Sequence, residues 1–158
     1  MFEHTERHAA LLRAVADTLA LKPVRQLARG PSVRAVYRVT VHHDDRRALD
    51  AVTTIIRDSA GATFTVRYEG LHHLRPTGQM LALERFSALT LAWQRAGFDR
   101  LRDQPGLPLH GPDLWLLERA AGTFVHSVIV APQIAGGSHA ALVEAVRAHL
   151  PEALREVA

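Results

Sequence analysis

Residues 62–70, ATFTVRYEG, alternate between apolar and polar side chains. Successive side chains of a β-strand point to opposite faces, so this period of two predicts a strand with one apolar and one polar face. The same alternation occurs in VRAVYRVTV, residues 33–41, and the segment 49–58 between the two is rich in β-branched residues. Short turn sequences separate the three segments. We therefore expect an antiparallel three-stranded meander with one buried face.

Three helices are predicted around this meander. Residues 5–20 carry leucine and valine at helical spacing, and Ser138 begins a similar pattern that Pro151 either kinks or restarts. The longest predicted helix covers residues 78–96 and is apolar on more than one side, so more than one neighbour should cover it. The segment 21–32, LKPVRQLARGPS, is interrupted by proline and glycine and is predicted to be an irregular connector.

A second hairpin is predicted for residues 113–131, DLWLLERAAGTFVHSVIVA, with Gly122 in its turn. The 158 residues are enough for one domain with its own core, and no repeat or long linker divides them. The expected fold is therefore a single α+β domain over residues 1–158. We expect an antiparallel sheet of about five strands with three helices, in the order α-β-β-β-α-β-β-α.

The composition excludes several kinds of chemistry. The chain contains no cysteine, so it forms no disulfide, thiolate nucleophile or cysteine-ligated metal centre. It also lacks the spaced glycines of a dinucleotide site and the motif of a nucleophile elbow. The longest stretch without acids, lysine or arginine is broken by histidine, proline and glycine, and the first residues lack the layout of a signal peptide. We expect a cytoplasmic protein that is not an enzyme, uses no cofactor and does not enter a membrane.

The basic charge of the chain suggests nucleic-acid binding as an alternative function. The net charge is +3 and the isoelectric point about 10.1, because all but Lys22 of the 19 lysine and arginine residues are arginine. Arg34, Arg38 and Arg67 are expected on the polar face of the meander. That face offers no aromatic side chain on which bases could stack. Any nucleic-acid binding is therefore expected to be weak and sensitive to salt.

Ten histidines raise a third hypothesis, a metal-dependent enzyme. His4 and His8 are one helical turn apart, and the pairs 42–43 and 72–73 follow the first and third predicted strands at the same end of the meander. A zinc site needs a third or fourth ligand within a short distance of the ion. Loop histidines without a metal are therefore favoured, and no metal site is expected.

Eight segments follow one another in the chain: TERHAALLRAVADTLA, VRAVYRVTV, ALDAVTTIIRD, ATFTVRYEG, QMLALERFSALTLAWQRA, DLWLLER, TFVHSVIVA and SHAALVEAVRAHL. Their order, over residues 5–157, resembles the type III secretion chaperone-like fold that the YbjN-type proteins of bacteria share. The resemblance implies a small homodimer without catalytic activity that holds an extended or partly unfolded segment of a partner protein. Secretion chaperones of this kind are typically acidic, so the basic charge of this chain favours the YbjN-like branch.

Surplus apolar surface supports the same hypothesis, a dimeric chaperone-like or adaptor protein that binds a client protein through apolar surface and strand edges. The strand 124–130 is apolar on both faces and, with the long helix, is expected to form the dimer interface. The interface residues are expected to be Leu91, Val125, Val128, Ile129 and Val130. Trp115 and Leu117 are the first candidates for a partner-binding pocket, and a core position is the alternative for Trp115.

Overall fold

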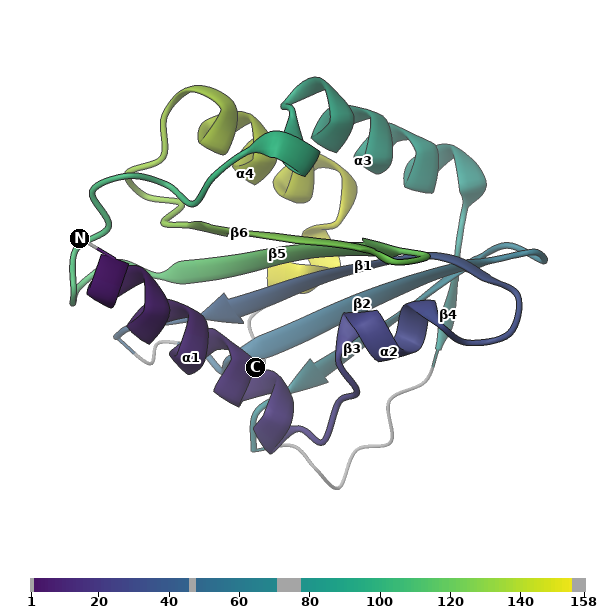
Figure 1. Cartoon of the computed structure of the whole chain (residues 1–158), viewed down its shortest axis with the longest axis horizontal. Coiled ribbons are helices and arrows are strands. Elements are labelled where there is room, and N and C mark those ends of the chain that lie inside the picture. The colour runs from purple at the N-terminus through teal and green to yellow at the C-terminus, as the bar shows by residue number, and fades with distance from the viewer. Residues whose placement is uncertain (1, 46–47, 71–77, 155–158) are drawn as a thin grey trace.

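Six strands form one antiparallel sheet in the described part of the chain, which comprises residues 2–45, 48–70 and 78–154 of this computed structural model (Figure 1). The strand order across the sheet is β4-β3-β2-β1-β5-β6. The strands are β1 (Val33–His42), β2 (Ala51–Asp58), β3 (Ala62–Tyr68), β4 (Gln79–Leu81), β5 (Leu114–Ala121) and β6 (Phe124–Val130). The α+β class with one antiparallel sheet is thereby confirmed, and the sheet has one strand more than expected.

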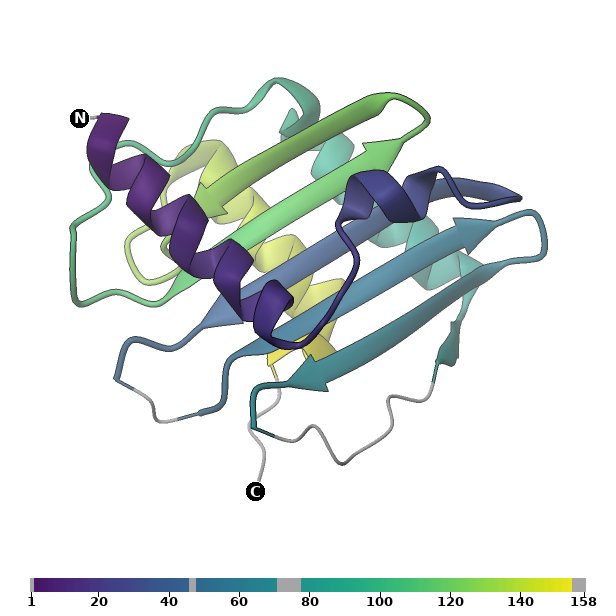
Figure 2. The same ribbon diagram turned by 60° about the horizontal axis from the view of Figure 1, so that its bottom comes forward.

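Two helical layers cover opposite faces of this sheet (Figures 1 and 2). One layer consists of α1 (Phe2–Thr18) and α2 (Val24–Ala28), and the other consists of α3 (Leu83–Arg95) and α4 (Gly137–His149). The 3-10 turns η1 (Phe98–Arg100) and η2 (Pro151–Leu154) follow α3 and α4, so Pro151 restarts the chain in a new turn. No helix among the described residues has both the length and the apolar content that a membrane span requires.

The predicted meander is confirmed in its topology. β1 pairs with β2 and β2 with β3, both antiparallel, and Thr53 of β2 lies opposite Val39 of β1 and Val66 of β3. The expectation of one buried face is wrong, because the α1–α2 layer covers the face that carries the polar residues of β1. Arg38 and Thr40 are therefore buried on that face. The sheet has two covered faces.

Two short elements lie where the sequence predicted other structure. α2 occupies the expected connector, where the carbonyl of Pro23 accepts two backbone N–H groups and starts a helical turn. Its Val24 and Ala28 are buried against the sheet. β4 pairs with β3, so the long helix begins at Leu83 and not at Gly78 as expected. Elements of five and three residues are too short to show a hydrophobic period, which explains why the sequence did not predict them.

The second predicted hairpin is confirmed. β5 and β6 pair from the hairpin turn outward, and Gly122 in that turn has a φ of +59°, a backbone conformation that favours glycine. β5 also pairs with β1, where Leu117 lies opposite Val39, so the hairpin extends the meander into one sheet. This arrangement places β6 at an outer edge of the sheet.

Candidate protein-binding surface

A shallow groove of about 720 Å³ runs between α3 and α4 on the outer side of their layer. Alanines from both helices line it, and their short side chains leave the space between the helices open. They are Ala92 of α3, Ala96 directly after this helix, and Ala141, Ala145 and Ala148 of α4. Larger side chains at these positions would fill the gap, so the alanines create a surface that the backbone of another chain can approach closely.

One of the two exposed leucines of α3 lies close to this groove. Leu83 and Leu91 expose 46% and 44% of their surfaces. Leu91 directly precedes Ala92 in the chain and comes one helical turn before Arg95, and both of these neighbours line the groove. A ridge of exposed leucine beside an apolar groove is typical of a surface that binds another protein.

Charges of opposite sign line the two sides of the groove. Arg95 lies on the α3 side, and Glu144 lies on the α4 side, where its carboxylate accepts a hydrogen bond of 2.8 Å from Arg147. A two-fold rotation exchanges the two sides of such a surface, so it can bring a basic residue of one copy opposite an acidic residue of the other, although Glu144 already pairs with Arg147 on its own helix.

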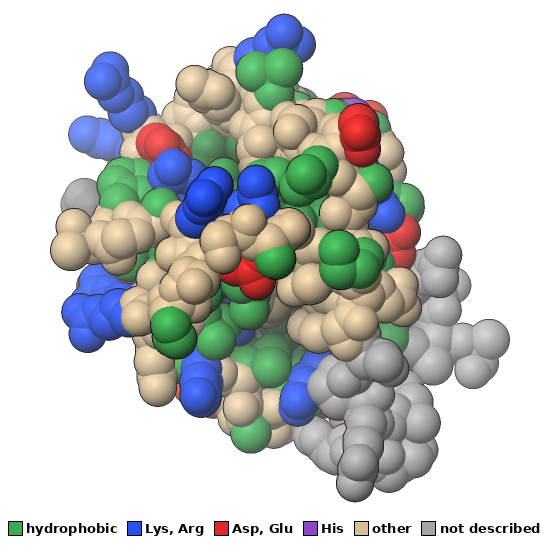
Figure 3. All heavy atoms as spheres, turned by 90° about the vertical axis from the view of Figure 1, so that its right-hand side faces the viewer, with side chains coloured by type: hydrophobic (Ala, Val, Ile, Leu, Met, Phe, Trp, Pro, Cys, Tyr) green, Lys and Arg blue, Asp and Glu red, His purple; other side chains and the backbone are tan. Residues whose placement is uncertain are grey.

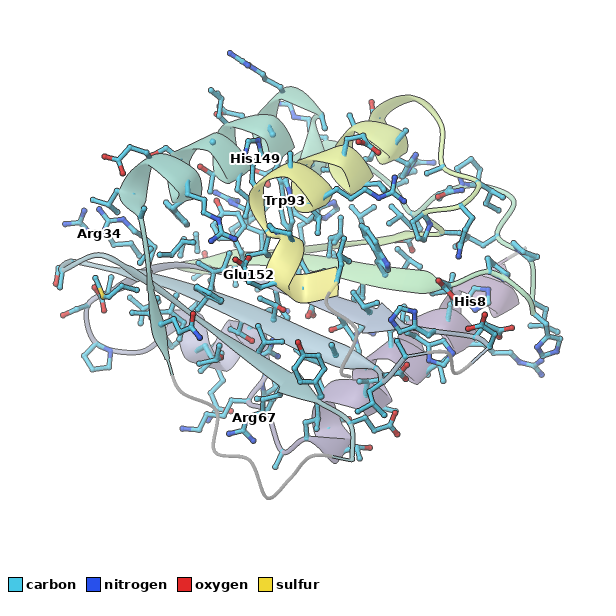
Figure 4. All side chains as sticks on the ribbon, turned by 180° about the vertical axis from the view of Figure 1, so that it is seen from behind. His8, Arg34, Arg67, Trp93, His149 and Glu152 are labelled. Atoms are coloured by element: carbon cyan, nitrogen blue, oxygen red, sulfur yellow. The ribbon has the colours of Figure 1, made fainter. Side chains whose placement is uncertain are left out.

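The distance between the two helices is held by contacts at one end of the layer. Arg85 of α3 donates a hydrogen bond of 2.7 Å to the backbone carbonyl of His149 and forms an ion pair with Glu152 of η2. Figure 4 shows His149 beside the two helices and Glu152 on η2, closer to the sheet. The groove is therefore built on a fixed pair of helices.

Four residues proposed from the sequence as contact residues are buried inside the subunit. Trp115 exposes 4% of its surface and Leu117 none, because both side chains belong to the core that α3 and α4 cover. Val128 and Val130 extend that core from β6. These side chains offer no open surface, so the structure corrects their assignment to a pocket or an interface: they are core residues.

The other three expected interface residues differ in exposure. Ile129 is buried on the opposite face of β6, in a cluster with Leu12 of α1. Val125 is half-buried and packs against the cluster around α2. Leu91 is exposed, and it is the one residue of the expected interface that lies next to the groove.

The outer edge of β6 is only partly covered. The backbone N–H of Ile129 donates to the Asp103 carboxylate at 2.8 Å, and the carbonyl of Ile129 accepts the N–H of Gln104 at 2.9 Å. Backbone groups that point outward recur at every second residue of an antiparallel strand, so Val125 and Ser127 also present theirs outward. The segment that contains Asp103 and Gln104 also contacts His126, whose Nε2 lies 2.8 Å from the carbonyl of Leu101. Among the described residues no backbone hydrogen bond is made to the outward groups of Val125 and Ser127, so this end of the edge, beside the 39% exposed Phe124, lacks strand pairing.

The three arginines that suggested a nucleic-acid surface do not share an exposed face. Arg38 exposes 3% of its surface and donates a hydrogen bond of 3.0 Å to Thr54, and Arg67 donates one of 3.1 Å to the backbone carbonyl of Leu19. Arg34 is exposed, and Figure 4 shows it far from Arg67. On the end of the molecule in Figure 3, basic side chains are likewise separated by apolar and neutral ones. The expected basic face is therefore wrong.

Arg38 is instead part of a polar group within the α1–α2 side of the sheet. It lies opposite Thr54 on β2 and opposite Glu118 on β5. Burial lowers the pKa of the Arg38 guanidinium and raises the pKa of the Glu118 carboxyl, while the attraction between the two charges opposes both shifts.

Two of the histidines join separate parts of the chain. Nδ1 of His42 lies 2.8 Å from a carboxylate oxygen of Asp50, and the other oxygen of Asp50 accepts the backbone N–H of His43. Nδ1 of His43 lies 3.6 Å from the carboxylate of Asp113, which precedes β5. These contacts tie the end of β1 to the starts of β2 and β5. The sequence singled out the histidines, but their acidic partners were not foreseen because they come from distant segments.

The metal hypothesis also involved His8 on α1 and the histidine pair at residues 72–73. His8 is buried on α1, whereas residues 72–73 lie outside the described residues. Across residues 2–45, 48–70 and 78–154, no group of three or more histidine or acidic side chains is placed to hold a metal ion. The contacts that the structure describes for His42 and His43 are those with Asp50 and Asp113.

No family model matches this sequence, and no curated protein matches it either. The groove between α3 and α4 and the open end of the β6 edge are the features from which a function can be inferred.

Proposed function

We propose that this chain is a non-catalytic chaperone-like or adaptor domain that forms a homodimer and binds a partner protein. The observation that carries the proposal is the alanine-lined groove between α3 and α4, with the exposed Leu91 beside it. The resemblance in element order to YbjN-type proteins supports the same function. It also implies a bacterial protein, and we propose from the sequence pattern that it works in the cytoplasm.

The occupant proposed for the groove is a second copy of the chain. In a two-fold symmetric interface each protomer must offer both a protruding and a receiving part on one surface. This surface has both, because Leu91 of one copy can enter the alanine groove of the other. The same rotation brings Arg95 of one copy towards Glu144 of its partner, which favours this pairing over a like-charged one.

The client is proposed to add to the open end of the β6 edge as an extended segment. The outward backbone groups of Val125 and Ser127 can hydrogen bond to an added strand, and Phe124 supplies an apolar contact beside them. Two residues of open edge support a short contact, so side chains of the client must contribute much of the affinity.

The dimer is tested with a charge placed in the groove. Ala141 is exposed and lines the groove, so Ala141→Arg should block the second copy without disturbing the core. Ala10→Arg is the matched control, because Ala10 is an exposed helical alanine on the other layer. Light scattering should give twice 17.4 kDa for the wild type and for the control, and 17.4 kDa for Ala141→Arg. A wild-type chain that is monomeric at micromolar concentration contradicts the dimer.

The client site is tested with a proline at the edge. Ser127→Pro removes an outward N–H and leaves the pairing of β6 with β5 intact. Ser127→Ala is the control that keeps this N–H. Affinity capture from cells treated with nuclease should recover a protein partner with the wild type and the control, and lose it with Ser127→Pro. Equal capture by both variants contradicts strand addition, and partners that disappear with nuclease favour the nucleic-acid alternative.

A further inference from the structure

A small cavity lies at the end of the sheet away from the β5–β6 turn, where the start of α1 runs beside the loop that leads into β5 (Figures 1 and 2). Side chains of α1, of the end of β1 and of residues 108–110 and 112 line it, together with the first residue of β5. None of these residues lines the α3–α4 groove or belongs to β6, so the cavity is independent of both proposed protein-binding surfaces.

The volume of the cavity limits the size of its ligand. It is about 210 Å³, below the range of about 300–1,000 Å³ that is typical of sites for drug-sized molecules. The ligand must therefore be smaller, of the size of a single amino acid.

The apolar part of the wall is accessible from outside. Leu11 of α1 and Leu109 of the loop expose 42% and 38% of their surfaces. Pro108 is also exposed, and Pro112 is half-buried. A ligand can therefore contact these four side chains without any rearrangement of the core, and they favour a ligand with an apolar group.

Two charged side chains of opposite sign also line the cavity. Arg7 lies on α1 and Asp44 follows β1, and both are exposed. Within the described part of the chain, neither side chain forms an ion pair or a hydrogen bond. Two unlike charges that share a small cavity without pairing can each bind the opposite charge of one ligand.

The histidines of the cavity contribute in different ways. His8 is buried and belongs to its inner wall, and His42 is oriented by Asp50, which lies 2.8 Å from its Nδ1. His110 is exposed beside Leu109, where a ring nitrogen can donate a hydrogen bond to a ligand. The accessible polar groups are therefore two donors, Arg7 and His110, and one acceptor, Asp44.

From these features we infer that the cavity binds a free α-amino acid with an apolar side chain. Its carboxylate accepts hydrogen bonds from Arg7 and His110, its ammonium group donates to Asp44, and its side chain contacts Leu11 and Leu109. A simple carboxylate would be repelled by Asp44 and a simple amine by Arg7, so the zwitterion is preferred to either. The site binds its ligand and performs no reaction.

The test uses L-leucine as the probe and follows the backbone amide resonances of the full chain by NMR. Leucine is expected to shift the amides of Asp44 and Leu109 saturably and to leave that of Ala145, in the α3–α4 groove, in place. Isocaproate lacks the ammonium group of leucine and isoamylamine lacks its carboxylate, so each should bind about fivefold more weakly, the value of one exposed ion pair. Glycine lacks the apolar side chain and should bind roughly tenfold more weakly.

Two substitutions assign the charges. Arg7→Gln should weaken leucine binding about fivefold and should not weaken the binding of isoamylamine, which has no carboxylate. Asp44→Asn should weaken leucine binding by a similar factor and should not weaken the binding of isocaproate, which has no ammonium group. Arg25→Gln and Asp17→Asn are the matched controls, because they remove the same charges from exposed helical positions outside the cavity. Both should bind leucine as the wild type does, and the dispersion of the amide spectrum reports that each variant is folded.

Three results would overturn the assignment. One is a set of unmoved Asp44 and Leu109 amides at tens of millimolar leucine, which would mean that the cavity holds only water. Another is binding of isocaproate, isoamylamine or glycine that equals the binding of leucine, which would exclude recognition of an apolar amino acid. The third is an unchanged leucine affinity in Arg7→Gln or Asp44→Asn, which would exclude pairing with that charge.

Discussion

The two faces of the sheet are packed in different ways. On the α3–α4 side, one continuous apolar cluster joins both helices, the sheet and η2, and it contains Trp93 and Leu117. On the α1–α2 side, the buried apolar residues fall into three smaller clusters, which contain Leu12, Val15 and Val24 respectively. The same strands therefore contribute to one large apolar core on one face and to three separate small apolar clusters on the other.

Polar residues account for this difference. Arg38, Thr54 and Glu118 occupy neighbouring positions on β1, β2 and β5 on the α1–α2 side, where they interrupt apolar contact. Hydrophobic stabilisation grows with the apolar area removed from water, so this layer is held less strongly. We expect α1 and α2 to detach before the rest of the domain unfolds.

Adjacent leucines of β5 provide the strongest test of the comparison, since Leu117 belongs to the α3–α4 core and Leu116 to a cluster under α1. Leu117→Ala is expected to lower the free energy of unfolding by about 3–5 kcal/mol, because dense packing prevents collapse of the cavity. Leu116→Ala is expected to cost about 2–3 kcal/mol, because fewer apolar groups surround it. Chemical denaturation measures both, and equal costs would show that the two faces are packed equally well.

The polar group on the α1–α2 side gives the next largest effect. Arg38→Met removes the main partner of Glu118 and is expected to destabilise the domain by about 2–3 kcal/mol, because it leaves a half-buried carboxylate with only the weaker attraction of Arg13. The double variant Arg38→Met, Glu118→Leu should recover most of this loss. A double-mutant cycle built from denaturation curves measures the coupling free energy between Arg38 and Glu118. If both variants are equally unstable, the loss does not come from the unpaired charge.

The raised pKa of Glu118 predicts a smaller effect that depends on pH. Burial raises this pKa in the folded state, so the folded protein holds the proton more tightly than the unfolded chain does. Stability should therefore decline as the pH rises from the ordinary carboxyl pKa through the raised one. Glu118→Gln cannot ionise, and its free energy of unfolding should lack this decline. Parallel pH profiles of the two proteins would contradict the prediction.

The smallest expected effect lies outside both helical layers, in the β2–β3 turn. The carboxylate of Asp58 accepts the backbone N–H groups of Ala60 and Gly61 at 2.8 and 2.9 Å, and these bonds lower its pKa. Its contribution to stability is present above the unfolded-state pKa and is lost as the pH falls through the folded-state pKa. Asp58→Asn keeps an acceptor oxygen, so only the pH-dependent part should disappear. Thermal unfolding across the acidic range measures it, and a wild-type pH profile in Asp58→Asn would refute it.

Most of the fold could be predicted because its main strands and helices are long enough to show a period. The alternation in residues 62–70 and the glycine at position 122 both predicted structure that is present. α2 and β4 were missed because they are too short to show a period and are held by their neighbours. The second covered face was missed because Arg38 and Thr40 are polar, and their burial depends on partners from other strands.

The candidate surface was less predictable than the fold. Strand 124–130 is apolar on both sides because helices cover both sides within the subunit, and the sequence pattern is the same for a strand that meets a second chain. Leu91 was predicted as an interface residue because its helix carries more apolar residues than one packed side can cover. The alanines of the groove were not, because alanine is common in any helix and becomes informative only when two helices bring several together.

The pairing of β1 with β5 has a consequence for how the chain folds. β2 and β3 follow β1 closely in the sequence, whereas β5 comes from the other half of the chain. Closing so long a loop costs conformational entropy before the contacts between the strands can offset it. The hairpins of β1, β2 and β3 can therefore form early, and the arrival of β5 sets the pace of folding. Until then β1 presents an unpaired edge, so aggregation during refolding should begin there.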